Sequence, residues 1–126
     1  MILNLETDYA IRIVHYLAQA GERRDAGKIA EKTGVTLRFS LKILHKLVTA
    51  GIVRSYKGAG GGYELARPGS EITLGEVIET MSGSLVFSHC QSQGHICSHP
   101  QGGCHFKEVF DDVSDYMRKK FDKATF

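Results

Sequence analysis

The fold is decided by residues 26–51, which read AGKIAEKTGVTLRFSLKILHKLVTAG. A short helix is predicted over 26–33, because Gly34 stops it, and a longer one over 36–50, with Thr36 as its N-cap. In the longer helix we expect a buried stripe of Leu37, Leu41, Leu44, Leu47 and Val48, and an outward basic set of Arg38, Lys42, His45 and Lys46. A short helix, a tight turn and a longer helix with an exposed basic face form a helix-turn-helix, whose second helix enters a DNA major groove.

A β-hairpin is predicted directly after these helices, with strands over 51–57 and 62–66. Its tip is rich in glycine, at Gly58, Gly60, Gly61 and Gly62. Glycine lets a backbone approach another surface closely, so a hairpin of this kind beside Lys57 suits contact with a DNA backbone. A nucleotide-phosphate loop is the competing interpretation, but Tyr63 and a strand follow the glycines instead of Lys-Ser/Thr or a helix. The hairpin therefore predicts the wing of a winged helix.

Three further helices are predicted, over 7–19, 73–81 and 104–123. The last carries one long apolar stripe, formed by Phe106, Val109, Phe110, Val113, Tyr116, Met117 and Phe121. That stripe is too long for so small a core, so we expect it to join a homodimer, with packing within the subunit as the alternative. The expected fold is mainly α with a β wing, divided into a winged helix-turn-helix domain (1–83), a cysteine-containing loop (84–104) and a dimerisation helix (105–126).

The charge distribution indicates a polyanionic partner. The 126 residues carry a formal net charge of +2, yet no Asp or Glu occurs from Val35 to Tyr63. That stretch has five basic residues, Arg38, Lys42, Lys46, Arg54 and Lys57. Lys and Arg that neutralise phosphates release condensed counterions, so we expect double-stranded DNA as the partner. Solvated faces of a helix and a hairpin are the alternative.

The composition excludes several classes of protein. The chain has 42% hydrophobic and 24% charged residues, a composition typical of folded globular proteins. Its length of 126 residues suits a single domain. It has no apolar run that could cross a membrane and no secretion signal, so we expect a cytoplasmic protein with reduced cysteines.

The cysteines lie in a 23-residue stretch, 84–106, that contains no charged residue. Cys90, Cys97 and Cys104 are too openly spaced for a typical zinc finger, whereas soft thiolates can embrace an iron-sulfur cluster. Three thiolates leave one ligand position of such a cluster unfilled, and a carboxylate that folding brings close to the cysteines is one candidate for it. The histidine candidates are His89, His95, His99 and His105. Burial of the cysteines as packing residues is the alternative.

The chain resembles the Rrf2 family of bacterial regulators, which includes IscR, NsrR and RirA. The likeness covers nearly the whole chain and is specific in the order of its motifs, which are TDYAIR (7–12), KILHKL (42–47), GIVRS (51–55), KGAGGGY (57–63), ITLGEVI (72–78) and the three cysteines. The resemblance implies a dimeric winged-helix regulator, expected to be a repressor, with a [2Fe-2S] or [4Fe-4S] cluster near the dimer interface. Members that lack a cluster also lack the three cysteines.

The resemblance also implies a fourth ligand. In one branch it is a histidine three residues after the last cysteine, where this chain has Lys107. In another it is an acidic residue of the first helix of the other subunit, and Asp8 matches that position. We therefore expect Asp8 of the partner subunit, with His105 as the fallback. The chain departs from the family pattern at two places. Its recognition helix reads Phe39-Ser40-Leu41-Lys42, where the family more often has an aromatic residue followed by Leu-Glu. It also ends at Phe126, earlier than most members do.

The predicted function is a DNA-binding regulator whose affinity is controlled by a cluster that senses nitric oxide, redox state or iron. The residues expected to contact DNA are Thr36, Arg38, Phe39, Lys42, His45, Lys46, Arg54, Lys57, Gly58, Gly60, Gly61, Gly62 and Tyr63. A cluster-free or zinc-bound regulator is one alternative. The other, a small Cys-His redox enzyme, lacks a nucleophile elbow and a Cys-x-x-Cys pair, so no enzymatic activity is expected.

Overall fold

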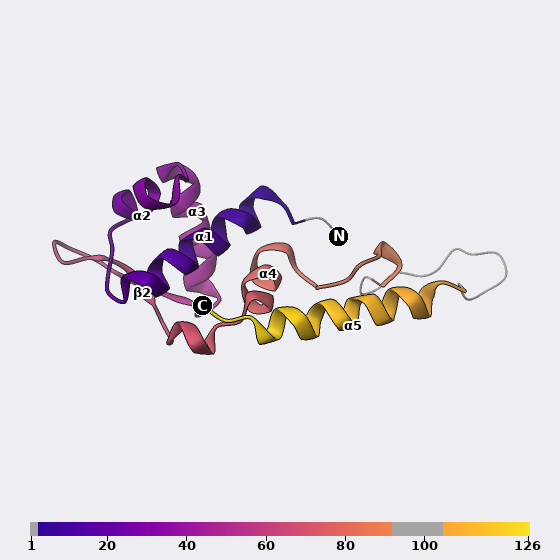
Figure 1. Ribbon diagram of the computed structural model, residues 1–126. Helices are drawn as coiled ribbons and strands as arrows, with labels where there is room; N and C mark the ends of the chain where they lie inside the picture. The colour runs from indigo at the N-terminus through magenta and orange to yellow at the C-terminus, as the bar shows by residue number, and fades with distance from the viewer. Residues whose placement is uncertain (1–2, 92–104) are drawn as a thin grey trace.

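The computed structural model describes residues 3–91 and 105–126 and is mainly helical with a two-stranded wing (Figure 1). Its elements are α1 (Leu5–Ala20), α2 (Ala26–Thr33), α3 (Leu37–Thr49), β1 (Val53–Tyr56), β2 (Gly62–Leu65), the 3₁₀ turn η1 (Gly69–Glu71), α4 (Leu74–Ser82), the 3₁₀ turn η2 (His89–Gln91) and α5 (Lys107–Lys123). The arrangement is the winged helix-turn-helix predicted from the sequence. Among the described residues, no helix has the length and apolar character needed to cross a bilayer.

The helices begin and end at the residues that local chemistry favours. The side chain of Thr36 caps α3 by accepting a hydrogen bond from the Phe39 amide at 3.3 Å, and Thr73 caps α4 at Glu76. Gly34 ends α2 in the left-handed conformation. These caps confirm the predicted second helix and the predicted start of the third, because each depends on residues within a few positions of the helix end.

The core lies where α1, α2, α3 and α4 meet, and the face by which α3 enters it is only partly the predicted one. Leu44 and Leu47 are buried and Val48 packs against the core, as predicted. Ser40, Ile43, Leu44 and Leu47 are buried, whereas Leu37 and Leu41 are 50% and 43% exposed. The prediction that Leu37 and Leu41 belong to the buried stripe is therefore wrong. Successive helical residues are about 100° apart, so a face centred on Ser40 and Ile43 turns Leu41 outward. The small Ser40 side chain, which donates to the Val35 carbonyl at 3.5 Å, fits this face against the turn.

The wing is an antiparallel hairpin, with Val53 paired to Leu65 and Tyr56 to Gly62. Its base is held by the loop before α2, where the backbones of Arg24 and Tyr63 exchange hydrogen bonds of 2.9 and 2.7 Å. The guanidinium of Arg23 stacks 3.4 Å from the centre of the Tyr56 ring and donates to the Gly60 carbonyl at 2.8 Å. These contacts fix the direction in which the wing tip projects beyond the helices (Figure 1).

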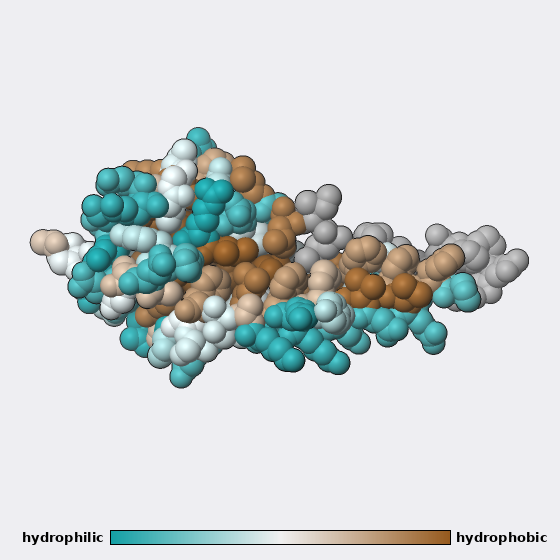
Figure 2. Space-filling view, in the orientation of Figure 1, coloured by the Kyte–Doolittle hydropathy of each residue, from teal (hydrophilic) through white to brown (hydrophobic). Residues whose placement is uncertain are grey.

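The long helix α5 carries two apolar stripes where the sequence predicted one. Phe110, Met117 and Phe121 are half-buried and share a stripe with the buried Ser114. The other stripe is exposed, and its members are Phe106, Val109, Val113 and Tyr116. Apolar surface runs along α5 in the space-filling view (Figure 2). The chain after α5 returns to the winged-helix body, where the Phe126 amide donates to the Gly69 carbonyl at 3.0 Å.

Gly62 is predicted to be essential to the wing. It has a φ of +140°, and an added Cβ would lie 2.6 Å from the carbonyl oxygen of Arg24. We expect Gly62→Ala to lower the free energy of unfolding by about 2 kcal/mol, from backbone strain and steric clash. Urea unfolding followed by circular dichroism measures this.

Gly60→Ala is the matched control, because a Cβ there meets nothing within 4 Å. Its unfolding midpoint should equal that of the unaltered protein. Equal midpoints for the two variants would contradict the role given to Gly62.

Candidate nucleic-acid interface and cysteine segment

The outward side of α3 carries several of the residues predicted to contact DNA. Arg38, Lys42 and His45 are exposed there, and Thr36 is exposed at the helix start. Phe39 is 44% exposed and lies on another side of the helix, where its ring packs edge-on against Tyr9 of α1 at 6.1 Å between centroids. Arg38, Lys42 and His45 thus face outward as the sequence predicted, whereas Lys46 is half-buried.

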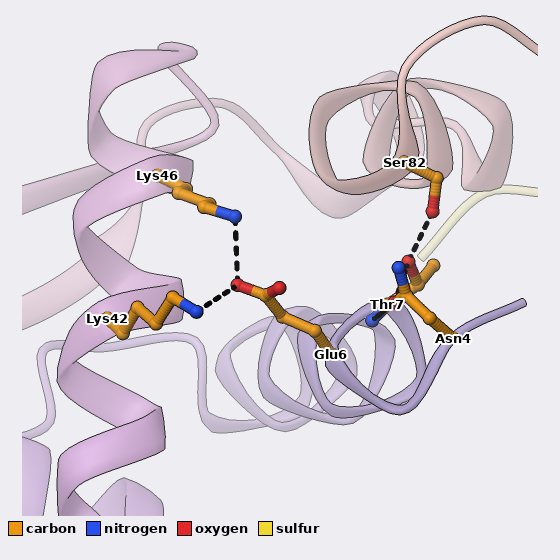
Figure 3. A network of polar contacts seen from close by, with 6 residues as sticks. All are labelled: Asn4, Glu6, Thr7, Lys42, Lys46 and Ser82. Carbon is orange, nitrogen blue, oxygen red and sulfur yellow. Dashed lines mark hydrogen bonds and ion pairs between the residues drawn. The ribbon is translucent and has the colours of Figure 1, made fainter.

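Glu6 of α1 forms ion pairs with two basic residues of α3, Lys42 and Lys46 (Figure 3). Glu6 lies 2.9 Å from Nζ of Lys46 and 3.6 Å from Nζ of Lys42. The hydrogen bond from Lys46, together with the charge of both lysines, holds the pKa of Glu6 below its ordinary value of 4.5 despite partial burial. Lys42 and Lys46 therefore present their charges from fixed positions, and part of that charge is balanced within the protein.

The next residue, Thr7, anchors the same turn to α4. Its side chain is fully buried, and its hydroxyl lies 2.6 Å from Oγ of Ser82 and 2.8 Å from the side-chain oxygen of Asn4 (Figure 3). Asp8 follows on a third side of the helix and pairs with Arg12 at 2.8 Å, with about half of each side chain exposed. Three successive residues of α1 thus point to α3, to α4 and to the surface.

The wing carries the remaining predicted DNA contacts. Arg54 and Lys57 are exposed, as are Gly58 and Gly60. Two of the wing glycines are also required by the fold itself, because a side chain would not fit at their positions. Gly62 is required as described above, and a Cβ on Gly61 would lie 2.5 Å from the Tyr56 carbonyl oxygen. Tyr63 is half-buried and serves the bridge to Arg24.

Three of the predicted cluster ligands lie within the described residues, namely Cys90, Asp8 and His105. Cys97 and Cys104 lie outside them, as do the candidates His95 and His99. Across 3–91 and 105–126, no three His, Cys, Asp or Glu residues come together as a metal site. Cys90 is a half-buried free thiol on η2 that donates to Oγ of Ser88 at 3.2 Å. His105 is exposed beside Phe106.

The turn that carries Cys90 is fastened to α5 by a polar clamp of Gln91, Asp111 and Ser114. Nε2 of the Gln91 side chain donates to Oδ1 of Asp111 at 2.8 Å, and the Ser114 hydroxyl donates to Oε1 of the Gln91 side chain at 3.0 Å. Lys107 also donates to Asp111, at 2.7 Å, and the two donors hold the pKa of Asp111 below its usual range. The position of Cys90 is therefore set by α5.

Sequence reasoning missed Glu6 and the clamp. Glu6 gives no local signal beyond an acidic residue in the first turn of a helix, because Lys46 is 40 positions away. Ser114 does leave a signal, since it interrupts the stripe of Phe110, Met117 and Phe121 at helical spacing. A small hydroxyl residue on an inward stripe suggests a buried hydrogen bond.

Comparison with known proteins places the chain among transcriptional regulators. The family model of Rrf2, described as an iron-dependent transcriptional regulator, matches residues 3–126. The protein aau3 of Rhizobium meliloti (strain 1021) is 39% identical over 97 residues, which are 76% of this chain and 63% of that protein. A putative HTH-type transcriptional regulator, Rv1287 of Mycobacterium tuberculosis, is 38% identical over 68% of this chain and 54% of its own length. The chain thus spans less than two thirds of either relative.

Solved structures share the fold over almost the whole chain. IscR of T. potens is 26% identical with a TM-score of 0.77, covering 99% of this chain and 82% of that one. CymR of B. subtilis, described as the global cysteine regulator, has a TM-score of 0.81 at 20% identity, covering 99% and 92% of the two chains.

Glu6 is predicted to contribute stability that depends on pH. Its folded pKa is lowered, so the contribution is complete above the unfolded value near 4.5 and disappears as the pH falls through the folded pKa. We expect Glu6→Gln to lower the free energy of unfolding by about 0.5 kcal/mol at pH 7, with the difference from the unaltered protein shrinking towards pH 3. Urea titrations at both pH values measure the difference.

Glu79→Gln, which alters an exposed carboxylate of α4, controls for the loss of one negative charge. A Glu6→Gln effect that is the same at pH 7 and pH 3 would contradict the ion pair.

Proposed function

The chain belongs to the Rrf2 family of transcriptional regulators, and from this premise we propose that it is a homodimeric DNA-binding repressor governed by an iron-sulfur cluster. The family is one of regulators and not of enzymes, as the sequence predicted. We assign residues 1–83 to DNA binding, 84–104 to the cluster and 105–126 to dimerisation, in a cytoplasmic protein.

The observation that carries the DNA-binding proposal is the outward face of α3. Arg38, Lys42 and His45 are exposed there on a helix whose opposite face is the centre of the core. A helix held this way enters a major groove with its N-terminal residues on base edges, while flanking cations and the wing contact phosphates. Arg54 and Lys57 supply such cations on the wing.

The exposed stripe of α5 supports the proposed homodimer. Phe106, Val109, Val113 and Tyr116 recur at spacings of three and four residues, the pattern of a helix that packs against another helix. A two-fold dimer joined along α5 presents two copies of α3, and two half-sites one helical turn (~34 Å) apart then form a palindromic operator.

The donors of this chain fit an iron-sulfur cluster. Cys90 offers a thiol on a turn fixed to α5, and Cys97 and Cys104 supply two more soft sulfur ligands. The Asp8 carboxylate is half-exposed at the first turn of α1, so it can serve as the fourth ligand for the partner subunit's cysteines, with His105 as the fallback. When bound, the cluster supplies a group that reacts with nitric oxide or oxidants, or that is lost when iron is scarce.

The first turn of α1 provides the proposed coupling between the two functions. Asp8 is two residues from Glu6, which holds Lys42 and Lys46, and Thr7 between them fastens the turn to α4. A ligand bond at Asp8 therefore tethers the turn that positions α3 to the cysteine segment of the other subunit. The position of the two α3 helices on DNA would then depend on whether Asp8 is bound, and a coupling of about 1–3 kcal/mol is typical of such linkage.

Salt dependence tests the DNA interface. We expect Lys57→Ala and Arg38→Ala each to weaken DNA binding and to reduce the slope of log affinity against log salt by about one unit for each phosphate that is no longer neutralised. In a dimer each substitution is present twice, so the slope should change by about two units. Fluorescence anisotropy with duplexes enriched from a random pool measures it.

Lys119→Ala, an exposed change on α5, is the control and should leave the slope unchanged. Unchanged slopes for Lys57→Ala and Arg38→Ala would argue against the proposed footprint.

Anaerobic reconstitution with iron and sulfide tests the cluster. We expect bound iron and visible absorbance, both lost in Cys90→Ser, and an altered spectrum in Asp8→Asn. DNA affinity should differ before and after chelation. Asp112→Asn, an exposed change on α5, is the control. A colourless, iron-free product, with or without zinc, would favour the cluster-free or zinc-bound alternative.

A further inference from the structure

The outward face of α3 carries two leucines that the core does not use. Leu37 is 50% exposed and Leu41 is 43% exposed, although neighbouring apolar residues of the same helix, Ile43 and Leu44, are fully buried. The third exposed apolar residue of this helix, Phe39, has a structural role, because its ring packs edge-on against Tyr9. Among the described residues, Leu37 and Leu41 belong neither to the core nor to the apolar side chains packed against it.

The two leucines lie among the basic residues of this face. Residues three and four apart on a helix are neighbours, so Leu41 adjoins Leu37, Arg38 and His45. All four side chains are exposed, and we call them the reading patch. The stretch from Val35 to Tyr63 has no acidic residue, so the surroundings of the patch favour an anionic partner.

An anionic partner that also covers the two leucines has to present apolar groups beside its negative charge. The DNA major groove does so, because phosphates line it and the C5-methyl group of thymine is the apolar group on its base edges. A groove on a protein able to accept two leucines would have to be acidic at its rim to match Arg38. Leu37 and Leu41 also lie in the first two turns of α3, the part of a recognition helix that reaches base edges.

We propose that Leu41, together with Leu37, reads thymine methyl groups in the operator. The inference rests on the proposed DNA-binding function and adds to it a chemical class of base at defined positions. Each half-site holds one or two thymines whose methyl groups pack against these side chains. Arg38 and His45 flank the contact; Arg38 neutralises a phosphate, and His45 binds a phosphate or a purine edge.

The test replaces thymine by deoxyuridine, which removes the methyl group alone. Duplexes are enriched from a random pool with the full chain, each thymine is replaced singly, and affinity is measured by fluorescence anisotropy at fixed salt. We expect the affinity to fall by about fourfold at one or two positions per half-site, the effect of uncovering one methyl group. This first step uses the unaltered protein, so it does not depend on the folding of a variant.

Variants then assign the contact to the leucines. In Leu41→Ala or Leu37→Ala, the thymine-to-deoxyuridine ratio at an affected position should fall to one. Leu5→Ala, which trims a 61% exposed leucine of α1, is the matched control and should keep the fourfold ratio. Lys57→Ala should weaken every duplex and also keep the ratio.

The outcomes separate this inference from the proposed function. If no duplex is enriched, both fail. If duplexes are bound with the expected salt dependence but deoxyuridine is neutral everywhere, only thymine reading is overturned. A ratio that persists in both leucine variants overturns it as well, and full DNA affinity in those variants would assign the leucines to a protein partner.

Discussion

Burial of one face of α3 is the constraint on which the rest of the structure depends. Ser40, Ile43, Leu44 and Leu47 are fully buried where α1, α2 and α4 converge. Their burial is the largest favourable contribution that this helix makes to folding, because each buried aliphatic side chain contributes about 1.5–3 kcal/mol. It also fixes the rotation of the helix about its axis, so the side chains that face outward are set by packing on the opposite side.

The N-terminal turn of α1 adds a second constraint, which acts on charge. Thr7 is buried against Ser82, so its neighbours Glu6 and Asp8 are held on either side of a fixed point. Glu6 consequently meets α3, and Asp8 faces solvent with Arg12. Glu6, an acidic residue in the first turn of α1, thereby balances part of the charge that Lys42 and Lys46 present to a polyanion.

The sequence predicted those parts of the molecule that depend on local interactions. The bounds of α2 and the cap at Thr36 follow from residues within one turn, and the wing follows from its glycines. The rotation of α3 could not be predicted, because two apolar stripes, one through Leu41 and one through Ile43, satisfy the same periodicity. Only the packing of three other helices selects between them. The ion pair of Glu6 and the clamp at Gln91 were missed for the same reason, since their partners are distant in sequence.

The two stripes of α5 explain how one helix can serve both its own subunit and another. Ser114 lies on the inward stripe and, through Gln91, holds the turn of Cys90. Val113, the adjacent residue, lies on the outward stripe, about 100° around the helix. A helix that packs on Val113 would therefore lie near the turn that carries Cys90. In the proposed homodimer, the contact between the subunits and the placement of Cys90 would be properties of the same helix. A group bound by Cys90 would then lie near the second subunit without any further element to guide it there.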